Sequence, residues 1–185
     1  MLRSLLLLAV LGCQGKKAAP PPDPVGIQVR DASGVLVAEL KPIRPCRGSV
    51  GPVDLIVGGP PLVATYGGTQ WAGSAAENGT VLTRDGEAVA RIFPVGDPKS
   101  AGVLDMHGVA LARITVTGQT ASVINAATVP VRKLSLAGTE IKTDEPAFTI
   151  TGTQDLVLAG LLSAPELSPE VRILAACERV LAKDK

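Results

Sequence analysis

The sequence has four thiol or imidazole side chains that could do covalent or acid–base chemistry: Cys13, Cys46, Cys177 and His107. A cysteine thiolate can be acylated, oxidised to a disulfide or bound to a metal, and an imidazole is the commonest general base in proteins. The 185 residues contain three cysteines and one histidine in all. Any thiol or imidazole chemistry of the chain therefore depends on these four positions and on the segments that carry them.

Cys13 ends the N-terminal run MLRSLLLLAVLGC. The run has one early cation, Arg3, then an apolar core over residues 5–11, then Gly12 directly before the thiol. This layout is typical of an export signal. A membrane span needs about 20 apolar residues, and the run is shorter than that. We expect residues 1–12 to be a signal peptide, and the alternative is an ordinary cleaved signal with a chance cysteine.

Val10-Leu11-Gly12-Cys13 resembles the lipobox of bacterial lipoproteins, in which an aliphatic, a variable and a small residue precede the thiol. The resemblance implies cleavage before Cys13, attachment of a diacyl group such as dipalmitate to its sulfur, and acylation of the new amino group. Several acyl chains anchor a protein stably, whereas one binds only marginally. Gln14 stands where an aspartate would imply inner-membrane retention, so we expect the periplasmic face of the outer membrane.

A short spacer follows the lipidation site. Residues 14–24 read QGKKAAPPPDP, and prolines favour an extended polyproline conformation that packs no core. We therefore expect residues 13–24 to be a lipidated cysteine with a Pro-rich tether, and residues 25–185 to be a single folded domain. A length of about 160 residues is typical of one domain.

Cys46 and Cys177 are the two thiols left for the folded domain. An exported protein meets an oxidising compartment, which permits a disulfide. Such a bridge would tie a Pro-rich loop, residues 44–48, to the C-terminal helix. The alternative is two separate thiols, with Cys177 buried on an apolar helix face. Sequence alone does not supply the Cα separation that decides between them.

His107 is the one histidine, and Asp105, two residues before it, is the candidate acid partner. A Ser-His-Asp hydrolase would have to use this imidazole. However, the chain has no Gly-x-Ser-x-Gly elbow, and residues two apart in a tight turn do not by default pair as base and orienter. We expect an exposed turn histidine, and we keep a hydrolase as a remote alternative.

The composition argues against several other classes of site. Lys and Arg number 18 against 17 Asp and Glu, and aromatic residues are 2% of the chain. A balanced charge gives no field for nucleic acid, and few rings give no base-stacking platform. One histidine and scattered acids form no metal site. Gly58-Gly59-Pro60-Pro61 lacks the Gly-Lys-Ser/Thr ending of a phosphate loop. We expect no metal and no cofactor.

A sequence pattern typical of β-hairpins recurs along the domain. Asp31, Asp85 and Asp105 each open a turn with a glycine, followed by a strand that alternates aliphatic and polar residues. Asp-Gly is a strong hairpin signal because both turn positions tolerate left-handed geometry. Residues 80–84 and 87–93 read as one strand pair. Further strands are expected at 26–30, 53–57, 113–117, 121–125, 129–136, 139–142 and 147–151. This pattern predicts an antiparallel meander or barrel.

The character of the sequence changes near Gln154. Residues 155–163 are apolar on nearly all sides, as in a helix enclosed by protein. Ser168-Pro169-Glu170 is a strong helix start. The apolar side chains of residues 169–182 share one helix face, and Arg172 and Arg179 are not on it. We expect the first helix inside or against the sheet and the second covering an opening. The fold class is therefore β-rich α+β with C-terminal hydrophobic helices.

The chain repeats an Asp-x-x-Gly pattern followed by a strand, and it ends in an apolar helix. This arrangement resembles the tubby-like group of folds, which includes the LURP-one-related proteins and scramblases. The resemblance implies a closed antiparallel barrel around a hydrophobic helix. It carries over no functional residue, because the family's basic phosphoinositide-binding patch has no counterpart here.

One segment remains a candidate contact site. Tyr66 and Trp71, the single tyrosine and tryptophan, lie in a glycine-rich stretch that runs to Gly79 and reads as a loop. Such rings offer contact area with a polar tip. The alternative is that Trp71 plugs the end of the barrel and Tyr66 caps a strand.

These observations favour a non-enzymatic structural or protein-interaction module, anchored in the bilayer through Cys13 and engaging another envelope protein. The alternative is a carrier that holds a lipid or another apolar ligand inside the barrel. A filled barrel interior would favour the module, and a cavity of roughly 300 Å³ lined by aliphatic side chains would favour the carrier.

Overall fold

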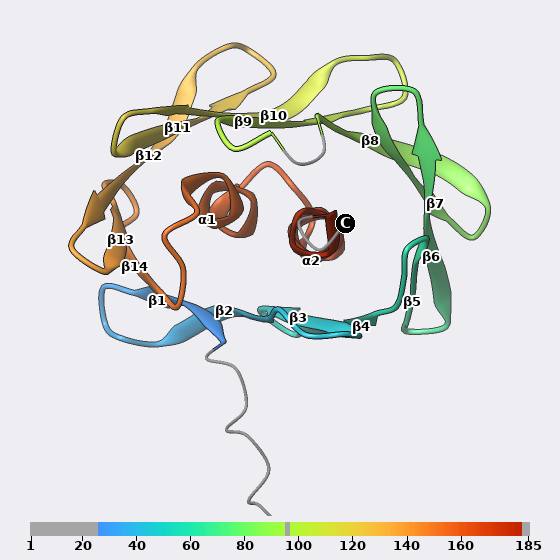
Figure 1. Ribbon diagram of the computed structural model, residues 1–185, viewed down its shortest axis with the longest axis horizontal. Coiled ribbons are helices and arrows are strands. Elements are labelled where there is room, and N and C mark those ends of the chain that lie inside the picture. Colours follow the sequence, from blue (N-terminus) through green and yellow to red (C-terminus); the bar gives the residue numbers. More distant parts are fainter. Residues whose placement is uncertain (1–25, 95–96, 183–185) are drawn as a thin grey trace, which may run out of the picture.

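The computed structural model describes residues 26–94 and 97–182. Fourteen antiparallel strands form one sheet. Each strand pairs with the strands before and after it in the sequence, except that β4 and β5 lie at the two ends of the strand order. β1 pairs with β14. The result is a nearly closed barrel (Figure 1). The strands are β1 (Ile27–Asp31), β2 (Leu36–Lys41), β3 (Cys46–Val50), β4 (Val53–Val57), β5 (Leu62–Tyr66), β6 (Thr69–Ala76), β7 (Gly79–Arg84), β8 (Glu87–Phe93), β9 (Ser100–Leu104), β10 (Ala110–Thr117), β11 (Thr120–Asn125), β12 (Pro130–Ala137), β13 (Glu140–Thr143) and β14 (Phe148–Thr151).

The sheet closes between β1 and β14, which are distant in sequence, and nearly closes between the consecutive strands β4 and β5. β1 pairs with β14 over four residues, from Gln28 opposite Thr151 to Asp31 opposite Phe148. β4 and β5 meet through a bridge between Gly58 and Val63, whose amides and carbonyls pair at 2.8 and 3.2 Å. The predicted β-rich antiparallel fold with C-terminal helices is confirmed.

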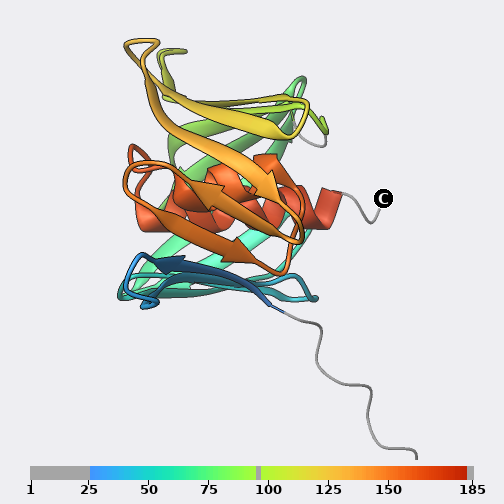
Figure 2. The same ribbon diagram turned by 90° about the vertical axis from the view of Figure 1, so that its left-hand side faces the viewer.

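Two helices fill the barrel. α1 (Leu156–Ser163) is buried along its whole length, and α2 (Pro169–Ala182) lies beside it inside the wall (Figures 1 and 2). Both helices match their predicted bounds, but the expectation that α2 covers an opening is wrong. Ala175 and Ala176 are fully buried and Arg179 is buried too, so α2 packs on more than one face. No helix in the described residues is long and apolar enough to span a bilayer.

Four strands were not predicted from the sequence: β3, β5, β6 and β9. The predicted loop at residues 44–48 becomes strand from Cys46 onward, and the glycine-rich stretch after Tyr66 is a hairpin whose second strand is β6. Gly67 and Gly68 do form the turn of this hairpin, but Gly48 and Gly73 lie within strands, where the absence of a side chain leaves space for a neighbouring one. A Cβ on Gly48 would lie 2.7 Å from Ile173 of α2, and one on Gly73 would lie 3.0 Å from Leu62.

The strand order gives the barrel two distinct ends. The described chain starts at Gly26 and stops at Ala182 at one end, which we call the near end. The opposite, far end carries the odd-to-even hairpin turns, from β1–β2 to β13–β14, and the α1–α2 connection at residues 164–168. Figure 2 shows the helices lying along the axis between these ends, with the C-terminal end of α2 on the right.

Three far-end hairpin loops share one geometry. Each begins with an acceptor, Asp31, Asp105 or Asn125, whose side-chain oxygen accepts the amides two and four residues later. The fourth loop residue has a positive φ of 83°, 83° and 59°, respectively: Gly34, Gly108 and Thr128. The predicted repeat therefore holds at Asp31 and Asp105, whereas Asp85 forms a two-residue turn with Gly86 and the Asn125 loop was missed.

Candidate functional site

The structure joins Cys46 of β3 to Cys177 of α2 in a disulfide, with their Cα atoms 5.8 Å apart. Both side chains are fully buried. Of the two readings that the sequence left open, the structure therefore has the bridge. It ties the inner helix to the wall across 131 residues of chain, which is a structural role.

Cys13, the predicted lipidation site, lies outside the described residues, as do the signal peptide (1–12) and the tether (13–24). The described chain nevertheless starts at the near end with Gly26.

His107 occupies the β9–β10 loop, where its side chain is exposed. Its backbone amide donates to Asp105 Oδ1 at 2.8 Å, so this carboxylate orders the loop backbone and does not orient the imidazole. In the part of the chain that the structure describes, the imidazole has no hydrogen-bond partner. Within the same residues, no three His, Cys, Asp or Glu side chains come together as a metal-ligand set.

Tyr66 and Trp71 lie at the far end, on the β5–β6 hairpin. Trp71 is 6% exposed and Tyr66 is half-buried, with its hydroxyl donating to the Pro52 carbonyl at 3.3 Å. Arg84 lies over the indole at 6.0 Å from its centroid. Together with Ser168 and Glu170 at the start of α2, these residues line a hollow of about 280 Å³. The indole thus packs on the barrel core instead of projecting from a loop.

The barrel interior is filled. The eight residues of α1 are all buried, and they pack on inward side chains of β9–β12 such as Ile114 and Val123. Between Ile92 and Ala101 of the wall and Leu161 and Ala175 of the helices there is a space of only about 10 Å³, roughly the least that holds one water.

Larger hollows lie at the ends of the barrel. At the near end, a hollow of about 690 Å³ is lined by Phe93 and Pro94 but also by Glu77, Asn78 and Glu178. Aromatic, amide and carboxylate side chains line it in place of large aliphatic ones, so it does not meet the aliphatic criterion for a carrier cavity. At the far end, a hollow of about 430 Å³ lies between the start of β12 and the β13–β14 turn.

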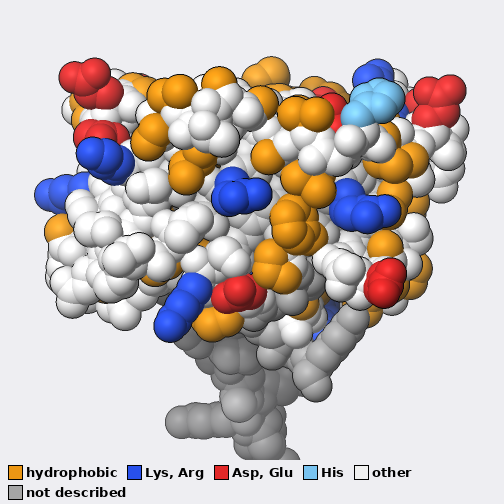
Figure 3. Space-filling model, turned by 90° about the horizontal axis from the view of Figure 1, so that it is seen from above, with side chains coloured by type: hydrophobic (Ala, Val, Ile, Leu, Met, Phe, Trp, Pro, Cys, Tyr) orange, Lys and Arg blue, Asp and Glu red, His pale blue; other side chains and the backbone are white. Residues whose placement is uncertain are grey.

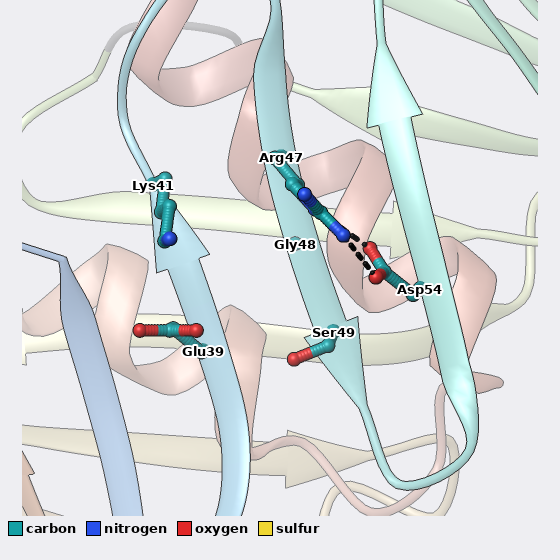
Figure 4. Close-up of a pocket in the computed structure, with 6 residues that line it drawn as sticks. All are labelled: Glu39, Lys41, Arg47, Gly48, Ser49 and Asp54. Atoms are coloured by element: carbon teal, nitrogen blue, oxygen red, sulfur yellow. Dashed lines mark hydrogen bonds and ion pairs between the residues drawn. The ribbon is translucent and has the colours of Figure 1, made fainter.

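A smaller hollow of about 170 Å³ lies on the outer wall, over β2, β3 and β4 (Figure 4). Arg47 and Asp54 form a pair there, with Nη2 2.6 Å from Oδ2, and this hydrogen bond lowers the pKa of the Asp54 carboxyl. Both side chains are about half exposed, at 52% and 49%. Exposed pairs contribute little to stability, and the charges of Arg47 and Asp54 satisfy each other here.

Exposed hydrophobic side chains gather at the far end. Five of the eight large ones in the described residues belong to the three loops of shared geometry and the strand that follows: Val35, Leu36, Met106, Val109 and Val129. We call these five the far-end rim. Figure 3, which views the β9–β12 face from outside, shows hydrophobic side chains along its upper edge, the far end.

Two buried arginines were missed by the sequence analysis. Arg179 is 4% exposed and Arg132 is 5% exposed. Arginine usually lies at the surface unless it is paired, so composition gave no signal. The alternation of β12 was the available clue, because Arg132 stands on the same face of the strand as Leu134.

No family model, no curated protein and no solved structure matches this chain.

Proposed function

We propose that this chain is a lipid-anchored envelope protein whose barrel is a non-enzymatic interaction module that presents its far end to another envelope protein. Acylation of Cys13 at the outer membrane would place the near end toward the bilayer, because the described chain starts there. The observation that carries the proposal is the position of the far-end rim, at the opposite end from this start.

The filled interior supports a module over a carrier. A ligand of even 300 Å³ would have to displace α1 or α2, and the disulfide at Cys177 holds α2 to the wall. The exposed position of His107 supports a non-enzymatic function over a hydrolase, which would need a serine and a carboxylate at the imidazole.

Anchoring is tested by mass spectrometry of the membrane-extracted protein. We expect an acylated Cys13 as the N-terminal residue, and a Cys13→Ser variant that is found in the soluble fraction. An unmodified thiol in a protein that washes freely from the membrane would overturn the anchor.

The interaction surface is tested by photo-cross-linking in cells. A photoreactive residue in place of Val109 or Val129 is expected to give one discrete cross-linked band. The matched control is Thr115 on the exposed outer face of β10. Equal cross-linking from Thr115, or none from either rim position, would contradict a far-end partner.

A further inference from the structure

Three large exposed hydrophobic side chains of the described residues lie outside the far-end rim: Ile43, Ile56 and Val63. Their exposed fractions are 40%, 56% and 46%, respectively. Ile43 lies in the turn after β2, at the near end, and Ile56 and Val63 face outward from the near-end halves of β4 and β5. Pro60 and Pro61, both exposed, lie in the turn between those two strands. We call these five residues the near-end corner.

The strand register places the near-end corner on one part of the outer wall. Val63 lies at the bridge that joins β4 to β5, and Ile56 lies opposite Arg47 of β3. Arg47 lies opposite Lys41 at the end of β2, two residues before Ile43. The strands β2, β3 and β4 lie side by side in one wall, and β5 follows them around the barrel (Figure 1). The five residues therefore lie on neighbouring strands and turns at the same end.

The charge around the near-end corner is positive. The two segments that form it, residues 40–48 and 55–66, contain no Asp or Glu. They contain three cations: Lys41, Arg44 and Arg47. The acids of β2–β4 are Glu39 and Asp54, which lie farther from the near end, and Asp54 is paired with Arg47 (Figure 4). An anionic surface would therefore meet attraction at this corner.

The described chain starts beside the same strands. A Cβ on Gly26 would lie 3.5 Å from the carbonyl oxygen of Leu40. Twelve residues separate Cys13 from Gly26 in the sequence, which is at most about 45 Å of extended chain. An acyl anchor at Cys13 would hold the near-end corner within reach of the lipid, and a second contact with that surface is then effectively intramolecular. Even a weak contact would be populated under these conditions.

A bilayer surface matches this combination of side chains. Protein sites that lie in the membrane interface combine apolar side chains with Lys and Arg, which attract anionic lipids. The stems of these cations lie along apolar surface while their charged ends stay in water. Among the described residues, the other near-end turns expose no large hydrophobic side chain. The near-end hollow beside β6–β8 carries Glu77 and Glu178, which would repel anionic lipid.

We propose that the near-end corner enters the surface of the bilayer that holds the acyl anchor, with Lys41, Arg44 and Arg47 at the level of anionic headgroups. The inference rests on the anchor of the proposed function and adds an orientation to it. The barrel is tilted so that β2–β5 meet the lipid, and the far-end rim points away from it. Acyl chains alone leave this orientation free, whereas a second contact fixes the direction in which the rim is presented.

The test is quenching of tryptophan fluorescence by lipids that are brominated in their acyl chains. Full-length acylated protein is reconstituted into vesicles of phosphatidylethanolamine and phosphatidylglycerol. Trp71 is buried at the far end, so its emission should not be quenched. Val63→Trp should add emission that the brominated lipid quenches. The matched control is Val109→Trp on the far-end rim, where the valine is 49% exposed, and its added emission should stay unquenched.

Ile43→Trp is a second reporter in a turn, in case Val63→Trp does not fold. No quenching at either position, in protein whose Cys13 is shown to be acylated by mass spectrometry, would overturn the corner and leave the anchor standing. Equal quenching of Val109→Trp would also overturn it, because the barrel would then have no fixed orientation. An unmodified Cys13 would overturn the proposed function, and this inference with it.

The lipid composition tests the part played by charge. Replacing phosphatidylglycerol by phosphatidylcholine removes the negative headgroups of that lipid, and we expect weaker quenching of Val63→Trp. Equal quenching in the two kinds of vesicle would overturn the assignment of the three cations to anionic headgroups. A photoreactive residue at Val63 that cross-links to a protein in cells, together with no quenching in vesicles, would assign the corner to a protein partner instead.

Discussion

The guanidinium of Arg179 on α2 holds the carboxylate of Asp155, the residue that caps α1. Nε lies 2.8 Å from Oδ2, and Nη2 lies 3.0 Å from Oδ1. The same Oδ1 accepts the amides of Val157 and Leu158 at 3.0 and 3.1 Å. The third donor, Nη1, reaches the carbonyl of Asp97 at 2.7 Å. One side chain thus joins α2, the start of α1 and the β8–β9 connection at the near end.

Arg179→Met should be strongly destabilising because it removes the cation that faces the largely buried Asp155 carboxylate. Removing one member of a buried pair costs about 3–5 kcal/mol, which urea unfolding would measure. The control is Arg47→Gln in the exposed pair with Asp54, where we expect a loss of less than about 1 kcal/mol. Equal losses in the two variants would contradict the role assigned to Arg179.

The bridge between Cys46 and Cys177 should contribute much of the stability. Closing a loop across 131 residues lowers the entropy of the unfolded chain by an amount worth about 4–5 kcal/mol. Denatured protein without reductant should show neither of these thiols free, and the Cys46→Ala/Cys177→Ala variant should unfold at much lower urea. A titratable thiol at either position in the native protein would contradict the bridge.

Gly160→Ala should destabilise the protein, although alanine normally favours a helix by about 1 kcal/mol. A Cβ at this position of α1 would lie 2.9 Å from two side-chain carbons of Ile114. Overpacking of this kind costs about 1–3 kcal/mol. Adding Ile114→Ala removes the opposing carbons, so the cost of Gly160→Ala should disappear in that background. A cost that persists there would place the strain elsewhere.

Thr128→Gly should stabilise the β11–β12 hairpin. Thr128 has a φ of 59°, where the two matching loops have Gly34 and Gly108, and left-handed geometry costs a β-branched residue about 1–2 kcal/mol. Allowing for the greater backbone freedom of glycine, we expect a gain of about 0.5–1 kcal/mol in the free energy of unfolding. The control Ala127→Gly should give no gain.

Asp97 should make stability depend on acid pH. The amide of Lys99 and the hydroxyl of Ser100 donate to its carboxylate and hold its pKa below the ordinary 3.8. The stabilisation is therefore present above pH 3.8 and is lost as the pH falls through the lower folded-state pKa. The difference in unfolding free energy between the original chain and Asp97→Asn should be constant near neutrality and shrink below about pH 4. A difference that stays constant down to pH 2 would contradict this.

Local patterns in the sequence were sufficient to predict several elements of the fold. Asp85-Gly86 specifies a left-handed two-residue turn, and the strands on either side form the predicted β7–β8 pair. Ser168-Pro169-Glu170 starts α2 where expected. These features depend on the conformational preferences of neighbouring residues, which sequence displays directly. The class of the fold, the helix bounds and the turn position of His107 followed from them.

Only the tertiary structure decided which residues meet across the barrel. It placed Gly48 and Gly73 in strands, because helix and wall side chains approach where a Cβ would stand. It joined Cys46 to Cys177, buried Arg132 and Arg179, and gathered the far-end rim from three separate loops. Each of these depends on closure of a sheet whose first and last strands are more than 110 residues apart in the chain. A local pattern records a residue's own preference, whereas burial, pairing and shared surfaces depend on which distant segment packs against it.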